Sequence, residues 1–483
     1  MLKKVYEKQN KKLSIDEIPH VRIADAAFPA PFRSGLEYSS PARGTWNIVH
    51  TGMLIPEAHE IFVCAAGCLR GVVLTAAEMG TADRFSTVAI RENNLLDGDM
   101  EDLVIEGVSD IISKLPKRPP AVLVYTSCVH HFTGVDLDMI YATLRKRFPD
   151  IDFTDCYMNP IMRKSGLTPD QLMRSRLYML LHERERAPQA VAIIGNDLPT
   201  DEDSDLMSIL KCMGLKVHEI TSCKTYAEYQ QMAESEVYIS YNPDAAPGGD
   251  MLAERLGGTH YALRFSYDYD EIEETFAGFA ELLEKETGAT GIRMSSEENA
   301  ALRAECEREL EETRRLIGDT PISIDYTFCP RPLGLARLLL DHGFNVTRVY
   351  ADGIPGGDRA AFDHLQKEHP DLMIYPTVHP GMRFAASANT LAHATACVEA
   401  KPGATAFTKK DDANDAVKVL AIGQKAAAFE NTDHFVNIVE GGGMIGYEAV
   451  RRTCALMRDA YTNKKEMREL VQVKGLGCEV CLR

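Results

Sequence analysis

The chain has 483 residues, of which 45% are hydrophobic and 26% charged, as in ordinary globular proteins. At about 150 residues per domain, this length predicts two to four domains. Acidic residues number 71 and basic residues 53, which leaves a net charge of −18. A chain with this balance has no general means of neutralising a phosphate backbone, so we expect no nucleic-acid partner.

The N-terminal residues, MLKKVYEKQNKKLSIDEIPH, are basic and then polar, without the apolar core or cleavage site of a signal peptide. No apolar run approaches the roughly 18 residues that a membrane span requires. We therefore expect a cytoplasmic protein with no membrane partner, whose twelve cysteines are reduced thiols. Reduced thiols in that number either pack as small hydrophobic residues or ligate a soft metal.

Short β-branched runs alternate with amphipathic helical stretches along the chain. After a strand that ends at Cys64, the predicted strands cover residues 121–128, 189–197, 215–221, 236–242, 258–265, 320–327, 344–353, 372–378 and 436–443. The predicted helices cover residues 136–147, 205–214, 269–286, 295–316, 332–343 and 444–461.

This alternation predicts an α/β protein whose parallel sheets are flanked by helices. The repeating units divide the chain into three Rossmann-like domains, residues 45–186, 187–317 and 318–462. An N-terminal extension, 1–44, and a tail, 463–483, complete the chain. In such folds, ligands bind at the carboxyl ends of the strands, so the loops there are expected to carry the chemistry.

The first such loop is HEIFVCAAGCLRG, residues 59–71. Cys64 ends the strand and Cys68 begins a helix, where the helix dipole favours a thiolate. The small residues between them, Ala65 to Gly67, leave room for a bulky inorganic group. On spacing alone, two small core residues at a strand–helix junction remain the alternative.

The second loop is VYTSCVHHFTGVDLD, residues 124–138, in which Cys128 follows a strand. His130 and His131 could ligate a metal or relay protons, or be ordinary loop residues. Three cysteines at two strand ends suit an iron–sulfur cluster better than zinc, because structural zinc sites normally have paired C-x-x-C knuckles.

The remaining cysteines carry weaker signals. Cys478 and Cys481 form a C-x-x-C at the tail, which is half of a metal site, a dithiol, or a surface pair without a role. Helical patterns predict packing roles for Cys212, Cys306 and Cys454.

The order of these motifs resembles the nitrogenase component 1 family of oxidoreductases. VCAAGC (63–68) is similar to the family's cysteine loop, and SCVHHFTGVDLD (127–138) to its strand-end cysteine and following turn. ENNLLDGD (92–99), AVAIIGND (190–197), GLARLLLDHGFNVTRVYADG (334–353) and GGGMIGYEAV (441–450) fall in the family's order. The resemblance covers about residues 45 to 460.

The resemblance implies three Rossmann-like domains and a homodimer, or a heteromer with a related component 1 subunit. It also implies electron delivery by an ATP-dependent reductase like the nitrogenase iron protein. The family's cluster ligands carry over to Cys68 and Cys128. Its first ligand would fall near residues 39–44, SSPARG, which contain no cysteine, and Cys64 is a possible substitute. The implied cofactor is an iron–sulfur cluster, 4Fe-4S or larger, at a subunit interface.

The second cofactor site departs from the family. Where nitrogenase catalytic subunits have a cofactor-binding cysteine, this chain has Ser240, and His434 is too early for the family's histidine. We therefore expect no iron–molybdenum type cofactor and no dinitrogen reduction, as in the relatives that reduce an organic substrate. Strand-end placement makes six residues candidates for the substrate cleft: His130, His131, Ser240, Tyr241, Arg331 and His379.

Three functions remain open from the sequence. The first is a nitrogenase-like iron–sulfur oxidoreductase with a cluster at Cys64, Cys68 and Cys128. The second is a non-catalytic scaffold for assembly of a metal cluster or cofactor. The third is a metal-free α/β binding protein whose cysteines only pack.

Overall fold

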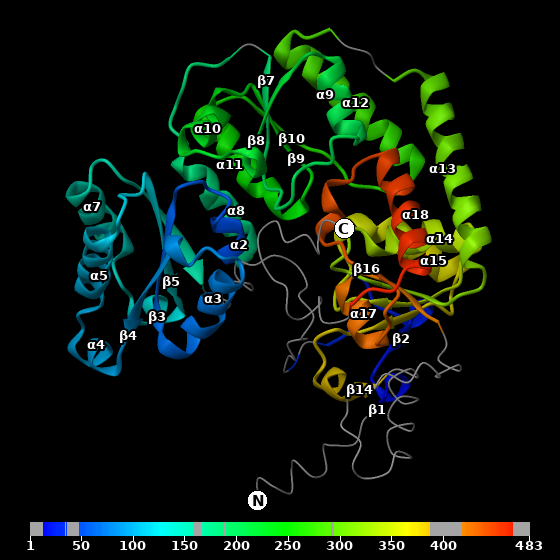
Figure 1. Ribbon diagram of the computed structural model, residues 1–483, viewed down its shortest axis with the longest axis horizontal. Coiled ribbons are helices and arrows are strands. Elements are labelled where there is room, and N and C mark those ends of the chain that lie inside the picture. The colour runs from blue at the N-terminus through cyan, green and yellow to red at the C-terminus, as the bar shows by residue number, and fades with distance from the viewer. Residues whose placement is uncertain are drawn as a thin grey trace, which may run out of the picture.

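The computed structural model describes residues 13–33, 35, 48–158, 166–187, 189–290, 294–386 and 418–466. Three parallel sheets flanked by helices form its framework, as the sequence pattern predicts (Figure 1). None of the described helices combines the length and the apolar character that crossing a membrane would need.

The first sheet has four parallel strands in the order β4-β3-β5-β6. These are β3 (His59–Ala65), β4 (Phe85–Ile90), β5 (Ala121–Ser127) and β6 (Asp152–Met158). The helices of this region are α2 (Ile48–Gly52), α3 (Ala66–Glu78), α4 (Glu92–Asp97), α5 (Met100–Lys114), α6 (Cys128–Thr133), α7 (Leu137–Arg147) and α8 (Pro169–Leu177). β5 is buried along its whole length, which explains why residues 121–125 form a continuous apolar run rather than an alternating pattern.

The second sheet is also parallel, in the order β10-β9-β7-β8. Its strands are β7 (Ala190–Ile193), β8 (Lys216–Glu219), β9 (Val237–Ser240) and β10 (Thr259–Ala262). Its helices are α9 (Asp205–Cys212), α10 (Tyr226–Gln231), α11 (Ala246–Leu256) and α12 (Tyr269–Thr287). The long α13 (Ser296–Ile317) follows and packs against the C-terminal helix α18 (Tyr447–Thr462), as the bond from Cys306 Sγ to the Tyr447 carbonyl shows.

The third sheet has six strands in the order β16-β15-β11-β12-β13-β2. They are β2 (Val21–Arg22), β11 (Ile322–Asp325), β12 (Val346–Tyr350), β13 (Met373–Tyr375), β15 (Leu420–Ile422) and β16 (Phe435–Val436). Its helices are α14 (Pro332–Asp341), α15 (Arg359–Glu368), α17 (Gln424–Glu430) and α18. Among these described strands β2 alone runs antiparallel, and β1 (Leu13–Ser14) pairs with β14 (Ala385–Ala386). The segment expected as an N-terminal extension thus supplies a strand to the third sheet.

Two apolar cores cross from one sheet region to the next. Phe62, Leu123 and Met173 share a core with Tyr238 and Leu252 of the second region. A second core joins strands β7 and β9 to β11 and β12. Because such interiors are close-packed, these shared cores hold the three sheets in fixed positions. The proposed boundaries at residues 186 and 317 therefore separate sheets that do not have fully separate cores.

Candidate functional site

The carboxyl ends of β3 and β5 carry the three cysteines singled out by the sequence, and we call this region the thiol edge (Cys64, Cys68 and Cys128). Cys64 lies near the end of β3, Cys68 in the first turn of α3, and Cys128 begins α6. The strands are parallel neighbours, paired as far as Val63 and Thr126, so the chain leaves both strands at one edge of the sheet. The sheet topology therefore brings together two motifs that lie far apart in the sequence.

The three thiols differ in burial. Cys64 is fully buried among the apolar residues beneath α3, whereas Cys68 is exposed and Cys128 half-buried. Burial, with smaller contributions from charge on Cys68 and Cys128, raises the pKa of the Cys64 thiol to about 12. Such a mutual electrostatic effect requires proximity. In the described chain, however, the three sulfurs are not a set lying within 4.8 Å of one another. A single ion bound by all three sulfurs would therefore require them to move closer together.

His130 caps the helix that Cys128 begins. Its Nδ1 accepts a hydrogen bond from the Ser127 backbone N–H at 3.1 Å. The ring is 2% exposed, and Nε2 has no hydrogen-bond partner among the described residues. Burial lowers the pKa of His130, which favours the neutral ring. His131, the next residue, is exposed beside Phe132.

A buried charge network joins the three sheet regions. Arg174 of α8 is 1% exposed and donates to both carboxylate oxygens of Asp197, at 3.1 and 2.5 Å. Its Nε donates to Asp170 at 2.9 Å, and its Nη2 lies 3.9 Å from Glu440. Asp197 follows β7, and Glu440 lies in the glycine-rich turn that follows β16. Arg174, Asp197 and Glu440 thus come from three different sheet regions.

The carboxyl groups of Asp197 and Glu440 are hydrogen-bonded to each other and titrate very differently. Burial, and then the charge of Asp197, raises the pKa of Glu440 well above its usual value. Burial opposes ionisation of Asp197 too, but Arg174 outweighs it and lowers the Asp197 pKa. These opposite shifts favour the proton on Glu440 and the negative charge on Asp197, a division of roles typical of paired acids.

The turn that presents Glu440 is fixed by close contacts with the second region. Gly443 has φ +75°, and a Cβ there would lie 2.9 Å from the Asp201 nitrogen and closer still to the Pro199 carbonyl. Its carbonyl accepts from Asp201 N–H at 3.0 Å. Glu440 itself has φ +54°, which is uncommon for a residue with a side chain. This close approach therefore explains Gly443, the last residue of the run VEGGG.

Tyr241, a predicted cleft residue, lies beside this carboxyl pair. With Asn196, Asp197, Asn242 and Glu440, it lines a cavity of about 10 Å³, close to the space that one water molecule needs. Its hydroxyl lies 3.1 Å from Thr200 Oγ1, and burial raises its pKa. Tyr241 is thus the one cleft candidate that lines this particular cavity.

Ser240 faces a different environment. Its Oγ lies 2.8 Å from His260 Nε2, and His260 Nδ1 lies 2.7 Å from Asp250 Oδ1. This order matches a serine–histidine–aspartate triad. Ser240 is only 1% exposed, however, so its hydroxyl is not accessible to an external substrate. The hydrogen bonds therefore serve to satisfy buried polar groups between β9, β10 and α11.

Arg331 and His379 lie elsewhere. Arg331 lines a cavity of about 210 Å³ between the loop before α12 and helix α14. Its charge is engaged by Glu271 at 2.7 Å and Asp358 at 3.2 Å. His379 caps the turn of Pro380–Phe384, where its Nδ1 accepts from the Gly381 N–H. The six cleft candidates thus occupy several separate environments.

All nine cysteines of the described residues are free thiols. Cys306 and Cys454 are buried, as their helical patterns predict, but Cys212 is exposed at the end of α9, so the packing prediction for Cys212 is wrong. Its side chain occupies the polar face of that helix. The tail pair, Cys478 and Cys481, lies outside the described residues.

The sequence patterns missed Arg174, Glu440 and His260. Asp197, by contrast, could have been found, because the predicted strand at residues 189–197 ends in Gly-Asn-Asp and ligands bind in the loops at such strand ends. Arg174 occupies a core-facing position of an amphipathic helix, and a single charged residue there gives little indication of its partner.

The fold and the thiol edge define a three-sheet α/β protein with cysteines at the carboxyl ends of neighbouring strands. A family of nitrogenase component 1 type oxidoreductases matches residues 49–382. The chain belongs to this family, which confirms the resemblance seen in the motifs.

Solved structures support the same fold. A structure described as nitrogenase Cp1 at pH 6.5 aligns with a TM-score of 0.57 at 12% identity, covering 89% of this chain and 94% of the other. Nitrogenase Cp1 at pH 5 gives 0.53 at 11% identity, covering 95% and 96%. No curated protein matches the sequence.

Proposed function

We propose that this protein is a nitrogenase-like oxidoreductase component that passes low-potential electrons through an iron–sulfur cluster to a bound substrate other than dinitrogen. The observation that carries the proposal is the thiol edge, where three cysteines lie at or just after the carboxyl ends of two neighbouring strands. Membership in an oxidoreductase family supports a redox role.

The residues of the thiol edge fit such a cluster. Cys68 and Cys128 are accessible and would be its outer ligands, whereas Cys64 is a buried, inner ligand whose thiol must lose its proton on binding. A Cβ built on Gly67 or Gly71 meets nothing within 4 Å, so the face of α3 beside Cys68 has open space. When bound, the cluster would supply one-electron transfer at low potential.

The test is anaerobic iron and sulfide quantitation with EPR, comparing Cys128→Ala and Cys68→Ala with wild type. Cys212→Ala is the matched control, because Cys212 is exposed on α9, away from the first sheet. We expect iron and the EPR signal to fall sharply in the first two variants only. Equal iron in all four proteins, or none in wild type, would exclude a cluster at the thiol edge.

The second part of the proposal is that the thiol edge faces a second component 1 subunit, identical or related. Large hydrophobic side chains are exposed on the helices that follow the first-sheet strands: Val73, Leu74, Leu95, Leu96 and Phe132. Leu96 is 86% and Phe132 68% exposed, which is costly in water unless a partner covers them. Because Cys68 lies on the same helix as Val73 and Leu74, and Cys128 on that of Phe132, the partner could complete the ligand set.

Phe132→Glu tests this interface. We expect it to weaken the dimer or heteromer in sedimentation velocity, because a charge would be buried in an apolar contact. Leu316→Glu is the control, since Leu316 is 46% exposed on α13, away from the first sheet. Equal effects of the two substitutions, or no effect of Phe132→Glu, would contradict the proposed interface.

The third part concerns the substrate side. The Asp197–Glu440 pair and Tyr241 lie where the second and third regions meet, and a protonated Glu440 would supply the proton that a reduction consumes. Ser240 replaces the family's cofactor-binding cysteine, and its hydroxyl is committed to His260. This supports the absence of an iron–molybdenum type cofactor.

The catalytic proposal needs a reductase partner. We expect turnover when the protein is mixed with an ATP-dependent reductase like the nitrogenase iron protein and its own substrate. Cluster transfer to an acceptor protein without turnover under any reductase would instead identify a scaffold.

A further inference from the structure

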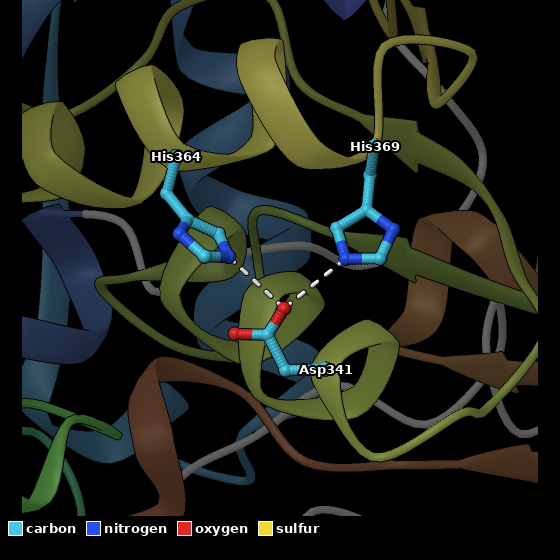
Figure 2. Close-up of side chains that lie close together, drawn as sticks. All are labelled: Asp341, His364 and His369. Carbon is cyan, nitrogen blue, oxygen red and sulfur yellow. Dashed lines mark hydrogen bonds and ion pairs between the residues drawn. The ribbon is translucent and has the colours of Figure 1, made fainter.

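Two histidines and one aspartate converge on the outer side of the third region. Asp341 is the last residue of α14, His364 lies on α15, and His369 follows α15 directly. The Nε2 atoms of His364 and His369 lie 3.0 and 3.1 Å from the same oxygen, Asp341 Oδ1. Figure 2 shows both rings turned toward this carboxylate from the neighbouring helix and its end.

We propose that Asp341, His364 and His369 bind a divalent transition-metal ion, Zn²⁺ in particular. Their three ligand atoms all lie within 4.8 Å of one another, so a small movement would place one ion between them. Two imidazole nitrogens and one carboxylate oxygen form a donor set typical of zinc sites with an open fourth position for water. Nothing in the proposed electron-transfer function uses these residues.

The surrounding structure holds the three side chains in place while leaving them accessible. Leu338 and Leu339 of α14 and Phe362 and Leu365 of α15 belong to one apolar core, which fixes the two helices. The His369 N–H donates to the Leu365 carbonyl at 3.0 Å and ends the helix there. The three side chains are between 27% and 33% exposed, so an ion can reach them from solvent.

The nearby charges also allow the site. Arg337 Nε lies 3.5 Å from the other oxygen, Asp341 Oδ2, and leaves Oδ1 to the histidines. Its guanidinium is also held by Asp268 at 3.1 Å, which offsets its charge. To bind the ion through Nε2, each ring must carry its proton on Nδ1 instead. No described residue hydrogen-bonds to Nδ1 of either ring, so the Nδ1–H group can donate to water.

The test is zinc binding to the full-length protein after treatment with a chelator, measured by competition with a chromophoric indicator. The double variant His364→Gln/His369→Gln is compared with wild type. His342→Gln is the matched control, because His342 lies next to Asp341 and is also half-buried beside a carboxylate, Glu307 at 3.1 Å. Cobalt replaces zinc in a second measurement, since thiolate ligands give charge-transfer absorption that nitrogen and oxygen ligands do not.

We expect wild type and His342→Gln to bind one more equivalent than the double variant, with cobalt absorption free of thiolate bands. Zinc should also raise the thermal midpoint of these two proteins more than that of the double variant. The single variant His369→Gln should bind zinc at least about tenfold more weakly than wild type. It replaces the double variant in the comparison if the double variant does not fold. Equal stoichiometry in all proteins, or binding only at millimolar zinc, would overturn the proposal.

Discussion

Replacing Glu440 by Gln should remove a specific pH dependence of stability. Glu440 is 15% exposed, shares a hydrogen bond with Asp197, and has a pKa raised well above 4.5, first by burial and then by the Asp197 charge. A group with a raised pKa contributes its full stability below the unfolded pKa. That contribution is lost as the pH rises toward the folded pKa, because the unfolded chain alone releases the proton.

The magnitude follows from a difference of one bound proton, which the folded state keeps on Glu440 and the unfolded state has released. Above about pH 4.5, wild type should lose about 1.4 kcal/mol of stability per pH unit through Glu440, until its folded pKa is reached. The amide of the Glu440→Gln variant would keep a hydrogen bond to Asp197 but has no proton to release. The variant should therefore gain about 1.4 kcal/mol per pH unit relative to wild type. Asp197 has a lowered pKa, and its own contribution is lost only as the pH falls through that pKa.

The assay is urea unfolding of both proteins at three pH values spaced evenly between about 5.5 and 7.5, analysed as the difference between them. That difference cancels every titrating group that the substitution leaves unchanged. Glu311→Gln is the control, because Glu311 is 63% exposed in a pair with Arg315, and its difference from wild type should stay flat. A flat or declining difference for Glu440→Gln would show that Glu440 is ionised in the folded protein and would refute the argument.

Arg174→Met should cost about 3–5 kcal/mol at neutral pH in urea unfolding, because it leaves the fully buried Asp197 carboxylate without its cation. Arg315→Met, which removes a 72% exposed charge, should cost less than about 1 kcal/mol, and comparable losses would contradict the buried network. Ser240→Ala should lower stability by about 1–3 kcal/mol because His260 loses a buried partner. Wild type should not react with a fluorophosphonate probe, and labelling of Ser240 would show that its hydroxyl is accessible.

Local elements were predictable because their signals lie in neighbouring residues. The apolar run at residues 121–128 predicts β5, and the spacing at residues 269–286 and 295–316 predicts α12 and α13, which the structure places at Tyr269–Thr287 and Ser296–Ile317. The segment GGGMIGYEAV (441–450) falls in the family's motif order, and in the structure its Gly443 lies in close backbone contact with residues 199–201. The glycine run by itself gives no indication of which residues it will approach.

Local sequence patterns were enough to predict the α/β class, the parallel sheets, and the positions of Cys64, Cys68 and Cys128 at strand–helix junctions, since these depend on periodicity and on what ends each strand. Which distant side chains meet could be seen only once the three sheets were packed together. Arg174, Asp197 and Glu440 belong to three sheet regions, and their pairing depends on apolar cores that cross between those regions. The pairing of Asp341 with His364 and His369 also depends on tertiary packing. Helices α14 and α15 must pack against each other before these side chains can lie close together. Long-range pairing depends on how the domains pack together, and the pattern of any one segment does not contain that information.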